Sequence, residues 1–206
     1  MPEYREELQG RLERTGGAVL LDSLGEALPY EKEHCGRVGE LAMHVVEETG
    51  GRPERILEAG FAGSLHDVGK IDPRVRFLVA LVRDLRPEES QEVNTIHTTL
   101  GAAKIKGLEV DEEDNNLIEA AVRAAYFHHH KPRDFLNLSG VPDVSMIRVI
   151  QIVDKFDAMQ DGDRPYHRGN PLSPEEALSD IEALLRDQMA FDNLAESTVG
   201  VLRAIP

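Results

Sequence analysis

The run GSLHDVGK, residues 63–70, places a histidine directly before an aspartate at the end of an apolar helical pattern. His34 precedes this pair and His97 follows it at nearly the same spacing, and a triple of histidines occupies residues 128–130. Asp154 ends a further apolar run. Neutral imidazole and carboxylate groups are ligands for divalent transition metals. The pattern therefore indicates a metal site formed by side chains from several helices.

The composition limits the possible partners. The chain has 206 residues and a formal net charge of −15, which argues against binding a nucleic-acid polymer, because such polymers are bound by Lys and Arg surfaces. A small phosphorylated substrate is compatible with this charge, since bound metal ions reverse the local field. No apolar run reaches the length of a membrane span, the N-terminus lacks a signal-peptide pattern, and Cys35 is the only cysteine. We therefore expect a cytoplasmic protein without membrane contact.

Apolar residues recur at helical spacing along nearly the whole chain, whereas the alternation typical of strands is scarce. Glycines and prolines divide this pattern into segments. Helices are expected over residues 3–14, 19–28, 31–49, 53–67, 73–85, 87–106, 111–130 and 144–159, and another begins near residue 173. We expect one all-α domain over residues 1–206, with N-terminal helices (1–30), a metal-binding core (31–160) and a C-terminal loop and helices (161–206).

Each candidate ligand lies on the apolar face of its expected helix. His34 shares a face with apolar residues one, two and three turns further on, and His97, His129 and Asp154 also align at helical spacing with mostly apolar residues of their own helices. Asp67 shares a stripe with Gly60 and Gly63, which lower helix propensity and so indicate a close approach of another helix. A buried polar group costs several kcal/mol unless it is paired. A metal ion would pair all of these groups at once.

The same residues resemble the HD-domain metal-dependent phosphohydrolases, and more narrowly the HD-GYP subgroup. The resemblance rests on residues 34–38, 65–71, 94–101 and 148–159, and it extends from about residue 18 to residue 194. It implies a helical bundle with a metal site between helices. It also implies hydrolysis of a small phosphorylated nucleotide, with cyclic di-GMP as the substrate of the subgroup, and two divalent ions, iron or manganese.

The resemblance also implies roles for individual residues. Asp67 is expected to bridge two ions and Lys70 to neutralise charge on a phosphate oxygen, so these two are the expected catalytic residues. Related proteins with a third ion carry a glutamate where this chain has Tyr30, which favours a binuclear site. The expected metal ligands besides Asp67 are His34, His66 and Asp154 on one ion, and His97, His129 and His130 on the other.

The histidine triple allows two alignments with the double histidine of the subgroup. The pair His128 and His129 would place His130 at a glutamate position of the subgroup. The pair His129 and His130 aligns Asp134 with an aspartate of the subgroup and places His129 on the apolar stripe of its helix. We prefer the second pair.

One segment departs from the subgroup, because its Gly-Tyr-Pro loop is replaced here by the shorter residues 131–137. Lys131 and Arg133 of this segment are expected to contact substrate phosphate, whereas Arg37 would contact phosphate or pair with a carboxylate. The altered loop leaves two alternatives to a cyclic-dinucleotide phosphodiesterase. One is an HD phosphohydrolase with another nucleotide substrate, and the other is a metal-binding regulatory module with little activity that acts through protein partners.

Overall fold

The computed structural model describes residues 2–79, 85–131, 144–162, 170–187 and 192–205. These residues form helices and no strand, which confirms the expected all-α fold for this part of the chain. In chain order the elements are α1 (Pro2–Thr15), α2 (Gly17–Ala27), α3 (Pro29–Glu48), α4 (Pro53–Leu65), the 3₁₀ turn η1 (Val68–Ile71), α5 (Pro73–Val79), α6 (Pro87–Lys106), η2 (Glu112–Asp114), α7 (Asn115–Phe127), α9 (Val144–Gln160), α10 (Pro174–Asp187) and α11 (Asn193–Arg203).

The helix α7 is shorter than its sequence pattern predicts. The expected helix ran to residue 130, but α7 ends at Phe127. The backbone N–H of His130 donates to the Phe127 carbonyl oxygen at 2.9 Å, which closes a tight turn. The His128 side chain donates to the carbonyl oxygens of Ala124 and Ala125, both at 3.0 Å, in the last turn of the helix. The three histidines therefore lie at a helix end.

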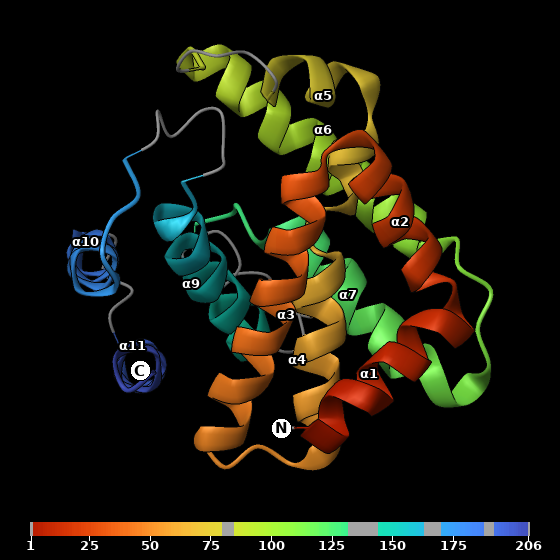
Figure 1. Ribbon diagram of the computed structural model, residues 1–206, viewed down its shortest axis with the longest axis horizontal. Coiled ribbons are helices and arrows are strands. Elements are labelled where there is room, and N and C mark those ends of the chain that lie inside the picture. Colours follow the sequence, from red (N-terminus) through yellow and green to blue (C-terminus); the bar gives the residue numbers. More distant parts are fainter. Residues whose placement is uncertain (1, 80–84, 132–143, 163–169, 188–191, 206) are drawn as a thin grey trace.

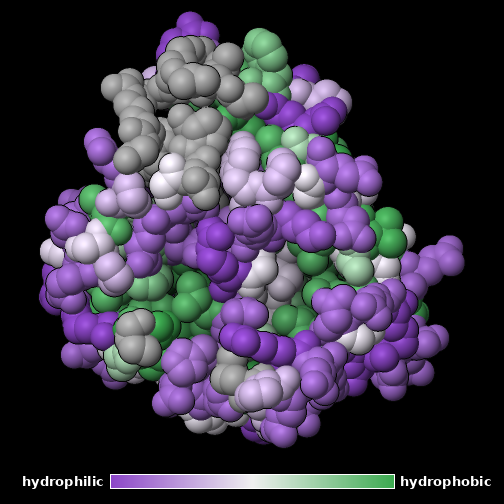
Figure 2. All heavy atoms as spheres, viewed as in Figure 1, coloured by the Kyte–Doolittle hydropathy of each residue, from purple (hydrophilic) through white to green (hydrophobic). Residues whose placement is uncertain are grey.

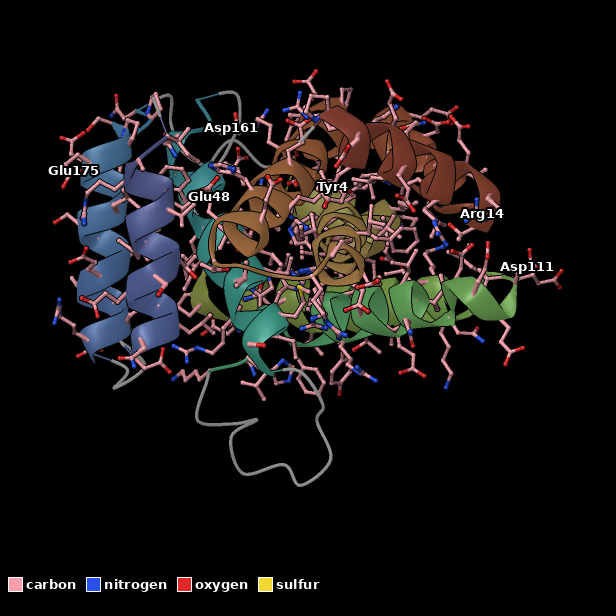
Figure 3. All side chains as sticks on the ribbon, turned by 90° about the horizontal axis from the view of Figure 1, so that it is seen from below. Tyr4, Arg14, Glu48, Asp111, Asp161 and Glu175 are labelled. Atoms are coloured by element: carbon pink, nitrogen blue, oxygen red, sulfur yellow. The ribbon has the colours of Figure 1, made fainter. Side chains whose placement is uncertain are left out.

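Helices α3 and α4 lie side by side at the centre of the molecule (Figure 1). α7 packs on α4 and α6, α9 packs on α3, and α1 and α2 cover another side of α3 and α4. α10 and α11 lie side by side beyond α9 (Figure 3). The helices that carry the candidate ligands thus surround the end of α4 where the His-Asp pair lies.

Glycines allow α3 and α4 to approach closely. A Cβ atom on Gly63 of α4 would lie 2.9 Å from the Cα atom of Gly39 and 3.0 Å from the Val38 carbonyl oxygen. A Cβ atom on Gly39 would lie 2.8 Å from the Gly60 carbonyl oxygen. The close approach expected from Gly60 and Gly63 is therefore confirmed, and Gly39 is its counterpart on α3. This contact brings the helix of His34 next to the helix that ends at the His-Asp pair.

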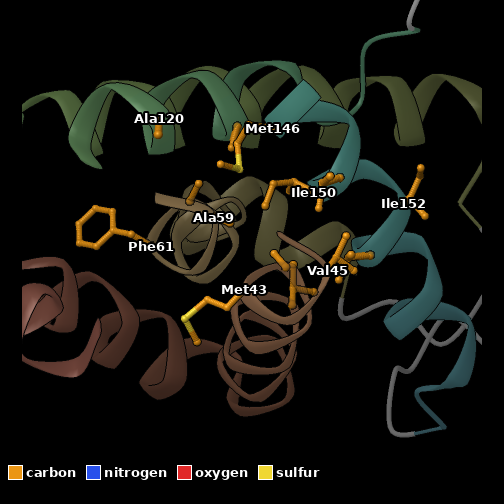
Figure 4. Packing of buried hydrophobic residues seen from close by; sticks show 14 of the residues in the cluster. Met43, Val45, Ala59, Phe61, Ala120, Met146, Ile150 and Ile152 are labelled. Carbon is orange, nitrogen blue, oxygen red and sulfur yellow. The ribbon is translucent and has the colours of Figure 1, made fainter. Parts of the chain in front are cut away.

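Two apolar clusters support these helices. The larger one joins α3, α4, α7 and α9 through buried residues such as Met43, Phe61 and Ile150 (Figure 4). A smaller one joins α2, α3, α5 and α6 through buried residues that include Leu24 and Val93. Burial of each large apolar side chain stabilises the fold by about 1.5–3 kcal/mol. The smaller cluster holds α5 and α6 against α3 beside the candidate site.

The surface is hydrophilic over most of the face in Figure 2, with an apolar patch where α11 faces α3 and α9. This patch belongs to a groove of about 1150 Å³ whose lining includes Leu41, Phe156 and Val201. Within the described residues, no helix combines the length and the hydropathy that a membrane span requires.

We expect Gly63→Ala to lower the free energy of unfolding by about 1–3 kcal/mol, because the new methyl group meets backbone atoms of α3 that cannot move aside. Urea unfolding followed by circular dichroism measures this change. Gly36→Ala is the matched control on α3, since a Cβ atom there meets nothing within 4 Å. Alanine at this helical position should leave stability equal or raise it by about 0.5–1 kcal/mol. Equal stability of the two variants would show that the close approach of α3 and α4 does not require glycine at residue 63.

Candidate metal centre

Two groups of potential metal ligands meet at the end of α4. The first contains His34, His66, Asp67 and Asp154, and the second contains Asp67, His97, His128 and His129. Within each group the candidate ligand atoms lie within 4.8 Å of one another. These side chains come from α3, α6 and α9 and from the residues that directly follow α4 and α7. Asp67 belongs to both groups.

The two carboxylate oxygens of Asp67 face different groups. Its Oδ2 atom lies 3.3 Å from His66 Nε2 and 3.8 Å from His34 Nε2. Its Oδ1 atom lies 3.3 Å from the Nε2 atoms of both His97 and His128. A carboxylate in this orientation offers one oxygen to each of two ions. The placement supports the bridging role expected for Asp67.

The orientation of the histidine rings is set by their Nδ1 atoms. In three of them Nδ1 donates to a backbone carbonyl oxygen of the preceding turn: His66 to Gly63 at 2.7 Å, His97 to Val93 at 2.6 Å and His128 to Ala124 at 3.0 Å. Because a carbonyl oxygen only accepts, Nδ1 carries the proton, and in the neutral ring Nε2 presents a lone pair. In His34, Nδ1 donates to Asp157 Oδ2 at 2.6 Å. All four Nε2 atoms therefore face the centre as potential ligands.

Atoms at the centre lack ordinary partners. Within the residues that the structure describes, His66 Nε2 and Asp67 Oδ1 are buried and have no hydrogen-bond partner. The Nε2 atoms of His97 and His128 face each other at 3.1 Å. A buried polar atom without a partner costs about 1–3 kcal/mol, and a cation between these atoms would remove that cost. Imidazole nitrogens and carboxylate oxygens in such sets fit divalent transition-metal ions.

The charges of the site also favour a cation. Burial opposes ionisation of Asp67, but Lys70 and His66 hold its pKa well below the usual range. Burial likewise opposes ionisation of Asp154, and the adjacent His34 and His66 side chains lower its pKa. Burial would lower the pKa of His66, yet the charges of Asp67 and Asp154 raise it to about 10. Two buried carboxylates thus require positive charge, which a proton or a metal ion would supply.

Glycine brings the His-Asp pair against α6. A Cβ atom on Gly69 of η1 would lie 1.8 Å from the His97 carbonyl oxygen and 2.7 Å from the Gly101 backbone nitrogen. Only glycine allows these backbones to approach so closely. The contact fixes the distance between Asp67 and His97.

Lys70 is buried beside the bridging carboxylate. Its Nζ atom lies 2.6 Å from Asp67 Oδ2 and 3.0 Å from Glu31 Oε2. Glu31 is fully buried, and the sequence analysis did not identify it. Its position one turn before His34, on the same face of α3, was the signal that could have identified it. Glu31 holds the Lys70 ammonium group next to the metal ligands.

The structure differs from the preferred alignment of the histidine triple. His128 and His129 lie in the second group, whereas His130 lies outside both groups and stacks on Tyr126 with ring centroids 5.4 Å apart. The buried face of α7 includes Leu117, Ala121 and Ala124, and helical spacing places His128 on this face. His130 instead follows the exposed Tyr126 around the helix end.

Of the other expected substrate contacts, Arg37 does not face the candidate centre. Arg37 pairs with Asp157 at 2.7 and 3.0 Å and with Asp161 at 2.5 Å, and it lines the groove beside α11, which favours the carboxylate alternative. Lys131 is exposed at the end of a described segment, and Arg133 lies outside the described residues, as does Asp134.

A cleft of about 350 Å³ opens onto the two ligand groups. Asp67, Lys70, His97, His129 and Asp154 line its inner part. The cleft therefore gives a small molecule access to Asp67 and to both ligand groups.

Three comparisons relate this chain to known proteins. Residues 32–159 match the family model described as the HD domain. A cyclic di-GMP phosphodiesterase of Thermotoga maritima is 33% identical over 172 residues, which cover 80% of this chain and 43% of that protein. The chain thus spans less than half the length of this relative. The solved HD domain of the L. monocytogenes phosphodiesterase PgpH, in complex with cyclic-di-AMP, has a TM-score of 0.59 and 17% identity, with 90% of this chain and 93% of that chain covered.

We expect His128→Ala to lose the ion of the second group, because His128 Nε2 faces Asp67 Oδ1 at 3.3 Å. Elemental analysis of the purified protein should show a decrease from about two ions per chain to about one. His130→Ala is the matched control and should retain both ions. Loss of metal in His130→Ala but not in His128→Ala would restore the alignment preferred from the sequence.

Proposed function

The chain belongs to the HD domain family, and on this premise we propose that it is a metal-dependent phosphodiesterase that hydrolyses a cyclic dinucleotide of the cyclic di-GMP class. The observation that carries the proposal is the position of Asp67, which presents one oxygen to each of two ligand groups at the base of an open cleft. The Thermotoga relative supports the substrate class, since it is a cyclic di-GMP phosphodiesterase.

The proposed cofactors are two divalent ions. His34, His66 and Asp154 would hold one ion, His97, His128 and His129 would hold the other, and Asp67 would contact both. Iron and manganese suit such sets of imidazole and carboxylate ligands. When bound, the ions supply Lewis-acid activation of water and neutralise charge on the phosphate. The proposed location is the cytoplasm.

The residues of the chain supply the remaining requirements of the reaction. The bonds from Nδ1 to backbone carbonyl oxygens hold the histidine rings in one orientation before substrate arrives. Lys70 places a positive charge beside the phosphate position, where negative charge increases during attack. Glu31 compensates the charge of Lys70 in the buried site and fixes its direction. The cleft brings the phosphodiester next to Asp67 and Lys70.

The test of the proposal is a hydrolysis assay with protein loaded with manganese or iron. Cyclic di-GMP, cyclic di-AMP and a chromogenic phosphodiester serve as substrates, and the products are separated by chromatography. We expect turnover of a cyclic dinucleotide that disappears after chelation and returns when metal is added. Asp67→Asn tests whether turnover comes from the candidate metal centre, and it should abolish both metal retention and turnover. Absence of turnover by fully loaded protein would favour a regulatory module instead.

We expect Lys70→Ala to retain metal but to lose about 10²–10³-fold in kcat, the effect of removing one electrostatic donor. The single variant leaves the buried Glu31 without the Lys70 ammonium group, so the stability of the variant protein also falls. The double variant Lys70→Ala with Glu31→Gln removes that excess charge. It should recover stability in thermal unfolding but not kcat. Recovery of both would show that Lys70 has only a structural role.

A further inference from the structure

The cleft is longer than the centre of two ligand groups requires. One wall is α6, where Ser90, Asn94 and His97 all line the cleft. Ser90 and His97 are seven residues apart, which at a rise of 1.5 Å per residue corresponds to about 10 Å along the helix. Along this wall, the candidate metal ligands occupy only the end of the cleft at His97. The rest of the wall is available to parts of the substrate beyond the scissile phosphate.

The opposite wall is α9, which contributes Asp154, Lys155 and Ala158. Ala158 lies one turn after Asp154 and Lys155, so the face of α9 toward the cleft lies between these two residues. Asp154 points to the metal ligands, with an oxygen 3.0 Å from His34 Nε2. Lys155 starts from the same turn but is exposed. It therefore lines the outer part of the cleft.

Lys155 differs from the other cations near the centre. The Lys70 ammonium group contacts Glu31 and Asp67, and the Arg37 guanidinium group contacts Asp157 and Asp161. By contrast, Lys155 forms no hydrogen bond or ion pair in the part of the chain that the structure describes. In a chain of net charge −15, an available cation in this cleft is suited to an anionic group of the ligand.

Between Lys70 and Lys155 the cleft is lined by both polar and apolar side chains. The half-buried Asn94 offers a side-chain amide that has no hydrogen bond within the described residues. Val79 and Val93 add apolar surface beside it. Apolar walls with a few polar groups are typical of sites for small organic ligands. A volume of about 350 Å³ is at the lower end for such sites, so it suits one nucleoside rather than two.

We propose that Lys155 binds the phosphate that is not cleaved, so that the cleft selects substrates with a second phosphate beyond the nucleoside next to the metals. This inference rests on the proposed phosphodiesterase function and assigns a residue for substrate specificity. In a cyclic dinucleotide the two phosphates lie on opposite sides of one small ring. When one phosphate is at Asp67 and Lys70, the other faces the outer cleft. A simple phosphodiester has no group that reaches Lys155.

The test compares Lys155→Met with the wild-type holoenzyme on two substrates, cyclic di-GMP and bis(p-nitrophenyl) phosphate. We expect KM for cyclic di-GMP to rise about tenfold, the effect of losing one charge-assisted contact at an exposed site. The kcat for this substrate and both constants for the simple diester should remain within about twofold. Lys104→Met is the matched control, because Lys104 is exposed on α6 outside the cleft and its removal changes the net charge equally.

Two results would overturn the inference. The first is an unchanged KM for cyclic di-GMP in Lys155→Met, and the second is an equal effect on both substrates, which would place Lys155 at the scissile phosphate or in the fold. Equilibrium binding of a slowly hydrolysed phosphorothioate analogue of cyclic di-GMP separates this inference from the proposed function. Binding that weakens in Lys155→Met without any turnover by the wild type would reject the function and retain the subsite. Absence of binding to the wild type would reject both.

Discussion

The position of one carboxylate, that of Asp67, determines the organisation of this molecule. It is buried where the ends of α4 and α7 meet α3, α6 and α9, and its two oxygens face two separate sets of imidazoles. A buried carboxylate is stable only with opposite charge and with partners for both oxygens. The close packing of Gly63 on α3 and of Gly69 on α6 brings those partners within reach. The same contacts that form the core therefore form the site.

The histidines of the two ligand groups are oriented in two different ways. His66, His97 and His128 are oriented by carbonyl oxygens of their own chain segments, so their direction follows once each local turn has formed. His34 is oriented by Asp157, and Asp157 is held by Arg37 at the edge of the groove beside α11. The orientation of His34 thus depends on the packing of α9 against α3.

The cations of the site also differ in their surroundings, and this difference suggests different tasks. Lys70 is buried and its direction is fixed by Glu31, which suits stabilisation of charge at one defined atom. Lys155 is exposed and available in the outer cleft, which suits recognition of a distant anionic group. Under the proposals above, Lys70 contributes to the rate of hydrolysis, whereas Lys155 contributes to the choice of substrate.

The sequence by itself determined the helical fold, the helix α6, and the placement of His34, His66, Asp67, His97 and Asp154 on buried faces, because helical periodicity is a local property that the order of residues expresses directly. It also indicated the close approach at Gly60 and Gly63. Only the tertiary structure decided that His128 and not His130 lies in the second group of candidate ligands, since this depends on which face of α7 is buried. It likewise decided that Glu31 and Asp157 are partners of Lys70 and His34, because such contacts join residues far apart in the chain and depend on how the helices pack.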